Sequence, residues 1–277
     1  MIPVVFDYQK VNTIDEAIAA LSSPDSKILA GGHSLIPAMK LRLNQPSKLV
    51  DIAGISELKG IEEEDGEIVI GAGTTHAEIA NDDLIKRELS FFAQAASIIG
   101  DIQIRNYGTI GGSLAHADPA ADWPPLVLAA DAAIEVKGKN GNRRIKATEF
   151  FTGLFSTSLQ DDEIITSIRI PVPANGTKTS YQKFEQPASR FAIVGCAVMR
   201  LAHGNTNIAF TGVADHAFRD VHAEQALSGK TIDNDSIHAA VNASLQHIDI
   251  MSDRFASKTY RRHLAKVYLK KALEAVM

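Results

Sequence analysis

Cysteine is almost absent from this chain of 277 residues, which has only Cys196. A single cysteine excludes a disulfide within the chain and an iron–sulfur cluster held by the chain's own thiolates. It is also typical of a reducing compartment. No apolar run approaches the ~20 residues that a membrane span needs, and the first ten residues lack the basic and apolar regions of a signal peptide. These absences predict a cytoplasmic protein without a membrane span.

Aromatic residues and basic charge are also scarce. Aromatic side chains make up 6% of the sequence, and the net charge at pH 7 is −5. Because nucleic-acid binding needs a basic face and often aromatic stacking platforms, both numbers argue against a nucleic-acid partner. The hydrophobic content of 45% is ordinary for a globular protein. The length exceeds what one simple core usually holds, so two or three subdomains are expected.

Hydrophobic periodicity divides the chain into three predicted units of an α+β fold. Residues 1–55 are expected to form a small βαβ-type unit with a short parallel sheet. Residues 56–176 mix hairpins with helices, among them one predicted over 84–99. A linker rich in proline and glycine at 171–176 precedes the last unit, 177–277. That unit is expected to contain an antiparallel meander followed by helices.

Two glycine-rich stretches are the strongest functional signal. Residues 104–122 read IRNYGTIGGSLAHADPAAD, with three glycines within five positions and no acidic residue before Asp118. Residues 29–35 read LAGGHSL and continue a predicted strand. Amides next to glycine, with hydroxyl neighbours and no nearby negative charge, suit a phosphate-bearing ligand. We predict that these two loops form the two sides of one cofactor site, although each alone is also consistent with a structural turn.

Common nucleotide-binding and hydrolase motifs do not fit the sequence. Residues 71–76, GAGTTH, have His76 where the Rossmann fingerprint has its third glycine, and no P-loop is present. Residues 32–36, GHSLI, depart from the nucleophile elbow of hydrolases at Ile36. The interpretation that remains is a mononucleotide or dinucleotide held by a different kind of loop pair. The alternative is a stand-alone nucleotide-binding or serine hydrolase domain.

A metal site is not expected. His116, Asp118 and Asp122 lie close in sequence, but their mixed spacing gives no helical face and no second histidine is near. Two other interpretations stay open for these carboxylates. They cap backbone amides of a loop, or Asp122 accepts a hydrogen bond from a ribose or ribityl hydroxyl.

Four segments together resemble a known family. They are AGGHSLIP at 30–37, GTIGGSLAHADPAAD at 108–122, DEIITSIRIP at 162–171 and the pair Lys183-Phe184. With them the whole chain resembles the FAD-binding medium subunit of the molybdenum hydroxylases, the group that includes xanthine dehydrogenase and aerobic carbon monoxide dehydrogenase. The resemblance implies a two-subdomain FAD-binding fold of the vanillyl-alcohol-oxidase type. A C-terminal domain with an antiparallel sheet and helices is expected to complete it.

The resemblance also implies a cofactor site without catalytic acid–base residues or metal ligands. The two glycine stretches would line the two sides of the FAD diphosphate. Asp122 would bind the polyol or adenosine side, Ile165 would pack near the adenine or the ring system, and Lys183 would be a cation beside the flavin. The implied FAD-binding residues are Ala30, Gly31, Gly32, His33, Ser34, Leu35, Thr109, Ile110, Gly111, Gly112, Ser113, Asp122, Ile165 and Lys183. The sequence departs from the family after Phe184, where Glu185, Gln186 and Pro187 replace residues that are often basic.

The partners implied by the resemblance carry the other cofactors. A large subunit would hold the molybdopterin cofactor and hydroxylate the substrate. A small subunit would hold 2Fe–2S clusters and pass electrons to the FAD of this chain, and from there to an external acceptor. The single cysteine is consistent with clusters that lie on another polypeptide. The expected assembly is a dimer of heterotrimers.

Overall fold

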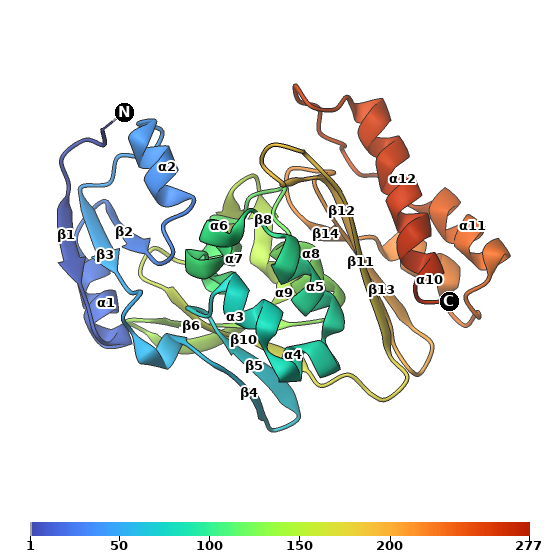
Figure 1. The fold of residues 1–277 in the computed structure, drawn as a ribbon, viewed down its shortest axis with the longest axis horizontal. Coiled ribbons are helices and arrows are strands. Elements are labelled where there is room, and N and C mark those ends of the chain that lie inside the picture. Colours follow the sequence, from blue (N-terminus) through green and yellow to red (C-terminus); the bar gives the residue numbers. More distant parts are fainter. Residues whose placement is uncertain (1) are drawn as a thin grey trace.

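The structure is a computed structural model that describes residues 2–277. Its elements lie in space much as they follow in the chain: an N-terminal unit, a middle region, and a C-terminal sheet covered by helices (Figure 1). Parallel and antiparallel sheets are combined with helices, so the fold is of the α+β class, as the sequence predicts. No helix of the described residues is both long enough and apolar enough to cross a membrane.

The N-terminal unit is a parallel sheet of three strands in the order β1–β3–β2, with two helices. Thr13 starts the first helix, because its hydroxyl accepts a hydrogen bond from the amide of Glu16 at 3.2 Å. Ile14, Ala17 and Ile18 recur on one face of this helix and are buried. The elements are β1 (Asp7–Lys10), α1 (Ile14–Leu21), β2 (Ser26–Leu29), α2 (Leu35–Lys40) and β3 (Lys48–Asp51).

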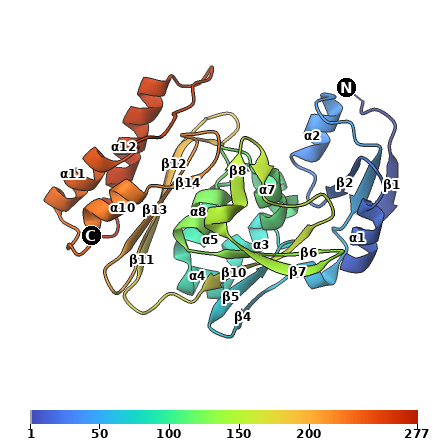
Figure 2. The same cartoon turned by 180° about the vertical axis from the view of Figure 1, so that it is seen from behind.

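The middle region is an antiparallel sheet of five strands in the order β4–β5–β10–β6–β7, with helices packed against it (Figure 2). Ile168 and Ile170 of β10 join the same buried core as Phe92 and Trp123 from the helices. The strands are β4 (Ile61–Glu64), β5 (Glu67–Gly71), β6 (Ala133–Gly138), β7 (Gly141–Lys146), β10 (Ile164–Pro171) and the short pair β8 (Phe151–Gly153) and β9 (Ser156–Thr157). The helices are η1 (Ser56–Leu58), α3 (His76–Asn81), α4 (Asp83–Glu88), α5 (Ser90–Ile98), α6 (Ile102–Tyr107), α7 (Ile110–His116), α8 (Trp123–Ala129) and α9 (Ala147–Phe150).

The helix predicted over 84–99 is in fact two helices, α4 and α5, which meet at Leu89. This residue leaves the helical conformation, with φ −130° and ψ 51°, and its side chain is fully buried. The break brings Ile85, Leu89 and Phe92 into one core. The prediction of a single helix is wrong. No glycine or proline marks the break in the sequence, because the break is caused by packing in the core.

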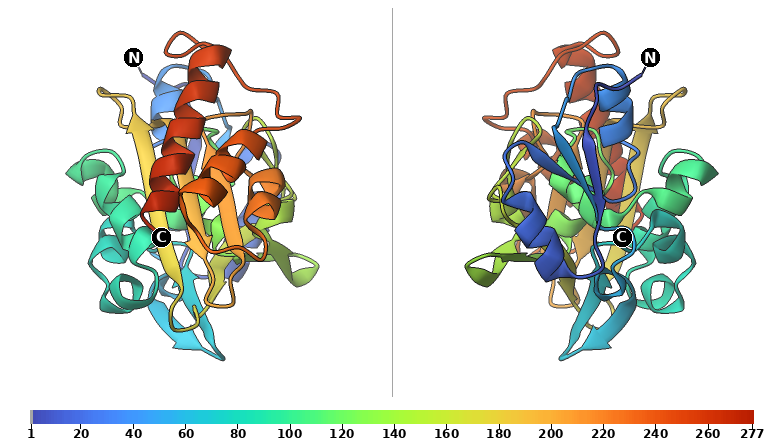
Figure 3. Two further views of the ribbon diagram at one scale, coloured as in Figure 1. Left: turned by 90° about the vertical axis from the view of Figure 1, so that its right-hand side faces the viewer. Right: turned by 90° about the vertical axis from the view of Figure 1, so that its left-hand side faces the viewer.

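The C-terminal sheet has four antiparallel strands in the order β11–β12–β13–β14 and is covered on both faces. Val194 and Val198 of β12 pack with the C-terminal helices, whereas Ala197 and Met199 join the core of the middle region. Helix α12 packs on β11 and β12 (Figure 3). Helix α8 packs on β12 and β13. The elements are β11 (Lys178–Glu185), β12 (Ala192–Arg200), β13 (Thr206–Thr211), β14 (Phe218–Arg219), α10 (Val221–Leu227), α11 (Asn234–Ala243) and α12 (Lys258–Glu274).

Backbone hydrogen bonds join the loop before α8 to this sheet. The amide of Gly212 donates to the carbonyl of Pro119 at 2.6 Å, and the amide of Ala192 donates to that of Ala120 at 3.2 Å. The hydroxyl of Thr211 donates to the same Pro119 oxygen at 2.8 Å. The middle region and the C-terminal sheet are therefore aligned by main-chain groups.

Gly212 is required at this junction because of its positive φ and because a neighbouring carbonyl leaves no room for a Cβ. A matched pair of glycine-to-alanine variants separates these two effects. The φ of Gly212 is +75°, and a Cβ would lie 2.5 Å from the carbonyl oxygen of Ile193. Gly66 has a similar φ, +78°, but open space around it. We expect Gly66→Ala to lower the free energy of unfolding by about 1–2 kcal/mol, the cost of the left-handed conformation alone. Gly212→Ala should lower it by clearly more in chemical denaturation, and equal losses would contradict the close backbone contact.

Candidate functional site

The two glycine stretches meet in the structure. A Cβ on Gly31 would overlap the carbonyl oxygen of Tyr107 and would lie 2.8 Å from the Cα of Gly108. A Cβ on Gly112 would come within 3.8 Å of the Cβ of Ala30. The main chain at Gly31 therefore packs directly on the main chain at Tyr107 and Gly108. Only glycine at position 31 permits this contact. We call the contact between residues 30–35 and 107–113 the glycine seam.

The first side of the seam presents unused backbone donors. The amides of Gly31, Gly32, His33 and Ser34 find no hydrogen-bond acceptor within residues 2–277. His33 and Ser34 are exposed, and Gly32 has a φ of +75°. Successive free amides in such a turn form a concave donor set for an anion. This side has the chemistry that a diphosphate needs.

The hydroxyl of Ser34 has no partner of its own in a helix cap. Ser34 precedes α2, but its side chain makes no capping hydrogen bond. Its hydroxyl also has no histidine partner in the described part of the chain, so the arrangement of a serine hydrolase is not formed. The ring of His33 lies instead 5.9 Å from the ring of Tyr107, across the seam.

The second side of the seam is helical, which corrects the prediction of a loop with free amides. Thr109 caps α7, and its hydroxyl accepts from the amide of Gly112 at 3.1 Å. The amide of Ile110 donates to Thr74, that of Gly111 to Ala72, and that of Ser113 to Thr109. All four donors are therefore satisfied inside the protein. The glycines suggested a loop from sequence, but the Thr109 cap and strand-like pairing upstream stabilise a helix.

The two adjacent glycines of α7 have different surroundings. A Cβ on Gly111 would lie 2.6 Å from the Cβ of Ala72, so this glycine lets α7 pack closely on the middle region. Gly112 is exposed and Ser113 is half-buried. On this side a ligand can contact Gly112 and Ser113, whereas Gly111 and Ile110 are buried.

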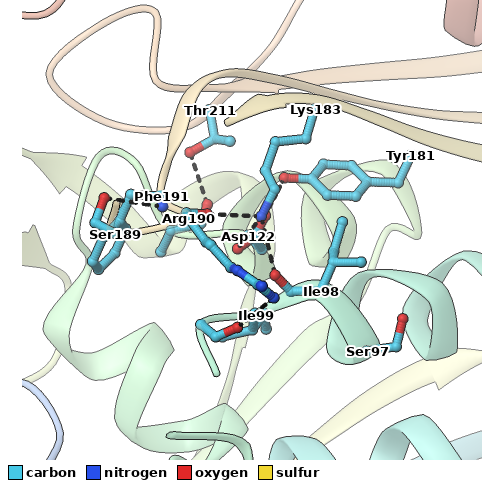
Figure 4. A network of polar contacts seen from close by, with 12 residues as sticks. Ser97, Ile98, Ile99, Asp122, Tyr181, Lys183, Ser189, Arg190, Phe191 and Thr211 are labelled. Atoms are coloured by element: carbon cyan, nitrogen blue, oxygen red, sulfur yellow. Dashed lines mark hydrogen bonds and ion pairs between the residues drawn. The ribbon is translucent and has the colours of Figure 1, made fainter. Parts of the chain in front are cut away.

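Asp122 and Lys183, both predicted as FAD contacts, are paired with each other (Figure 4). The ammonium of Lys183 lies 3.1 Å from one carboxylate oxygen of Asp122, and the hydroxyl of Tyr181 donates to Asp122 at 2.6 Å. Lys183 also donates to the carbonyl of Arg190 at 2.9 Å. The Lys183 side chain is 2% exposed. The pair therefore connects the start of α8 with β11, and its predicted contact with FAD stays a prediction.

Burial dominates the electrostatics of this network. Desolvation raises the pKa of Asp122, while the charge of Lys183 and the hydrogen bond from Tyr181 act to lower it. Desolvation likewise raises the pKa of Tyr181 well above its ordinary value, and the neighbouring carboxylate adds to the shift. Tyr181 is therefore a neutral donor, and the charge of Lys183 favours the ionised form of Asp122 against the effect of burial.

The other predicted positions lie in different surroundings. Ile165 of β10 is 5% exposed and belongs to the core with Ile110 and Leu114. Its predicted packing near the adenine or the ring system of the cofactor stays a prediction. Glu185 ends β11 and is exposed, and the turn that follows returns the chain to β12. In that turn Arg190 donates to the carbonyl of Gly100 at 3.2 Å. The turn thus reaches the connection between α5 and α6.

His116, Asp118 and Asp122 do not converge. His116 packs beside the ring of Phe155 at 5.1 Å, Asp118 accepts from the amide of Ala120 at 2.8 Å, and Asp122 is engaged with Tyr181. No group of three or more His, Cys, Asp or Glu side chains within residues 2–277 is arranged to hold a metal ion.

The sequence analysis missed a buried polar pair beneath the seam. The indole of Trp123 donates to Nδ1 of His76 at 3.1 Å. Burial is the main cause that lowers the pKa of His76 to about 3, and the nearby charges of His33 and Arg105 contribute to the same shift. A sequence signal was available, because Thr75 and Glu78 form a capping box that makes His76 the first residue of α3.

Comparisons with known proteins agree with this geometry. Residues 4–173 match the family described as the FAD binding domain in molybdopterin dehydrogenase, and residues 179–276 match the CO dehydrogenase flavoprotein C-terminal domain. The chain belongs to this family of FAD-binding subunits of molybdenum hydroxylases. The predicted family, the α+β FAD-binding fold, the FAD cofactor and the oxidoreductase class are thereby confirmed, and the alternative without flavin is not supported.

Relatives cover the chain almost end to end. The carbon monoxide dehydrogenase medium chain of Hydrogenophaga pseudoflava is 39% identical and covers 99% of this chain and 98% of its own. The xanthine dehydrogenase FAD-binding subunit of Escherichia coli is 32% identical over 97% and 95%. A solved carbon monoxide dehydrogenase from Hydrogenophaga pseudoflava superposes with a TM-score of 0.96, at 40% identity, over 100% of this chain and 98% of that one. These relatives are medium or FAD-binding subunits of larger enzymes.

The buried ion pair yields a stability prediction. Lys183→Met should lower the free energy of unfolding by about 3–5 kcal/mol, because it leaves Asp122 buried without its counter-ion. Adding Asp122→Asn to this variant should restore part of the loss. Lys258→Met, which removes an exposed pair with Asp249, is the control and should change little. Equal losses from Lys183→Met and Lys258→Met in urea denaturation would rule out a stabilising role for the buried pair.

A second prediction concerns acid stability. The pKa of His76 is lowered from 6.5 to about 3, so as pH falls the unfolded chain takes up this proton before the folded one. The contribution of neutral His76 is complete above about pH 6.5 and is lost toward pH 3, with a slope of about 1.4 kcal/mol per pH unit. His76→Gln should lack this component. His203→Gln, at an exposed histidine that does not contribute to the pKa shift of His76, is the control and should change the slope little, and a wild-type slope in His76→Gln would refute the assignment.

Proposed function

We propose that this chain holds FAD across the glycine seam and passes electrons from iron–sulfur clusters of a partner subunit to an external acceptor. The observation that carries the site is the set of free amides at Gly31–Ser34, packed directly against α6 and α7. When bound, FAD supplies reversible electron transfer, and the protein supplies binding, orientation and electrostatics.

The diphosphate would be held mainly by the first side of the seam. The amides of Gly31, Gly32, His33 and Ser34 are free to donate to it, and no acidic residue occurs within 29–35 or 104–117. Arg105 lies in α6, half-buried, with its guanidinium donating to the carbonyl of Gly100 at 3.0 Å. A cation near the seam favours a dianionic linker. The contribution of α7 would come from Gly112 and Ser113, because its inner amides are already bonded.

The remaining predicted contacts are part of this proposal. Asp122 would accept from a polyol or ribose hydroxyl while its other interactions stay with Lys183 and Tyr181, an arrangement supported by its two carboxylate oxygens. Lys183 would place a positive charge near the flavin. Leu35, Thr109, Ile110 and Ile165 would form the apolar and backbone support of the site, consistent with their partial or complete burial.

The proposed assembly follows the family. Relatives named medium chains suggest a small iron–sulfur subunit and a large subunit with molybdopterin, arranged as a dimer of heterotrimers. The single cysteine of this chain supports iron–sulfur clusters that lie elsewhere. A cytoplasmic location belongs to the same proposal, as do the domain boundaries 1–55, 56–176 and 177–277.

Co-expression with candidate large and small subunits tests the assembly. Affinity capture of this chain should retain both, and the complex should show flavin, iron–sulfur and molybdenum signals in stoichiometric amounts. The isolated chain should bind FAD and show the absorption bands of flavin. If the purified chain, titrated with FAD, shows neither a spectral change nor quenching of flavin fluorescence, the proposed function is wrong.

One pair of variants isolates the electrostatics of the seam. His33 is exposed in the first stretch, so His33→Asp and His33→Asn differ by one charge without crowding the site. A carboxylate a few ångströms from a diphosphate costs about 1–3 kcal/mol, so His33→Asp should bind FAD at least about fivefold more weakly than His33→Asn. Equal dissociation constants in fluorescence titrations would place the diphosphate away from this loop.

A further inference from the structure

His76 lies directly behind the second side of the glycine seam. It opens α3, where the Thr75–Glu78 capping box fixes the helix start. Its amide donates to the carbonyl of Gly108 at 2.9 Å, and helices α3 and α6 are in contact. The side chain is 4% exposed. Its position is therefore set by main-chain and capping interactions rather than by a mobile loop.

The hydrogen bond from Trp123 fixes the tautomer of this imidazole. An indole N–H is a donor only, so Nδ1 of His76 must be the acceptor across their 3.1 Å contact. A neutral imidazole then carries its proton on Nε2. The burial that lowers the pKa of His76 to about 3 keeps it neutral throughout the physiological range. Nε2 is thus a permanent, uncharged hydrogen-bond donor.

This donor has no acceptor in the protein. Within the described chain Nε2 forms no hydrogen bond. The atom is not completely enclosed by the protein. Nε2 lies 2.7 Å from the position that a Cβ on Gly108 would occupy. The Cα of Gly108 in turn is 2.8 Å from the position of a Cβ on Gly31. The unpaired N–H therefore lies beside the seam, at the point where its two sides touch.

We propose that His76 is a cofactor-binding residue whose Nε2–H donates a hydrogen bond to an oxygen of FAD held at the glycine seam. The inference rests on the proposed function and adds a side-chain donor to a site otherwise made of backbone amides. Trp123 acts as the positioning residue, since its indole holds the proton on Nε2. Gly108 must be glycine, because any Cβ would displace the imidazole.

Two substitutions at position 76 separate a donor from a packing role. His76→Gln keeps an N–H donor of similar reach, whereas His76→Phe keeps the ring shape without a donor. The apo forms of both variants and of wild type are titrated with FAD, and flavin fluorescence gives the dissociation constant. We expect His76→Phe to bind FAD about tenfold more weakly, with His76→Gln within about threefold of wild type. Thermal unfolding without FAD reports any loss of packing separately.

The outcomes distinguish this inference from the proposed function. If wild type binds FAD and both variants bind it equally well, the donor role of His76 is overturned while the flavin site stands. If wild type does not bind FAD, the proposed function itself fails.

A measurement on the wild-type protein covers the case in which the variants do not fold. In protein labelled with ¹⁵N-histidine, His76 should show a protonated Nε2 and an unprotonated Nδ1, and its Nε2–H resonance should shift on addition of FAD. Trp123→Phe should release the tautomer and introduce exchange between the two nitrogens. An Nε2–H resonance that does not change with saturating FAD would overturn the inference.

Discussion

The close approach of two main-chain segments at Gly31 is the constraint on which the site depends. The first glycine stretch can meet Tyr107 and Gly108 only because position 31 has no Cβ. This contact joins the N-terminal parallel sheet to helices α6 and α7 of the middle region. It also leaves a row of amides without partners, which would be costly in a buried segment and is tolerated where solvent or a ligand can reach them. A single steric requirement thus links the packing of the two regions to the presence of free backbone donors.

The two sides of the seam are both rich in glycine, but they differ in whether their backbone amides are free. On the first side, glycine frees backbone donors, and the neighbouring His33 and Ser34 are exposed. On the second side, Gly111 allows α7 to pack on Ala72, and the amides are used inside the protein. The asymmetry means that the backbone donors are free on one side and already paired on the other. Beneath the support, His76 and Trp123 form a polar pair whose one unpaired N–H lies next to the seam.

The C-terminal sheet is aligned to the site by two kinds of interaction. Backbone hydrogen bonds around Gly212 and Pro119 set its orientation, and the Asp122–Lys183 pair adds a buried ionic contact. Burying charges offsets much of their attraction, so such a pair specifies a geometry more than it adds stability. Asp122 precedes α8 of the middle region, and Lys183 lies on β11 of the C-terminal sheet. The geometry of the pair therefore depends on how the middle region and the C-terminal sheet are placed relative to each other.

Sequence alone determined the α+β class, the family, and the two stretches that meet at the glycine seam, because periodicity, caps and glycine clusters are local and keep their meaning in any fold. Thr13 and Asp233, for example, cap helices through hydrogen bonds from amides three residues further on. The break at Leu89, the helical state of 110–116 and the satisfied amides of α7 were decided by tertiary structure. Core packing and hydrogen bonds to Ala72 and Thr74 override local preference there. The pairing of Asp122 with Lys183, 61 residues apart, and of His76 with Trp123 likewise required the folded chain, because no local pattern specifies which distant side chains share a buried space.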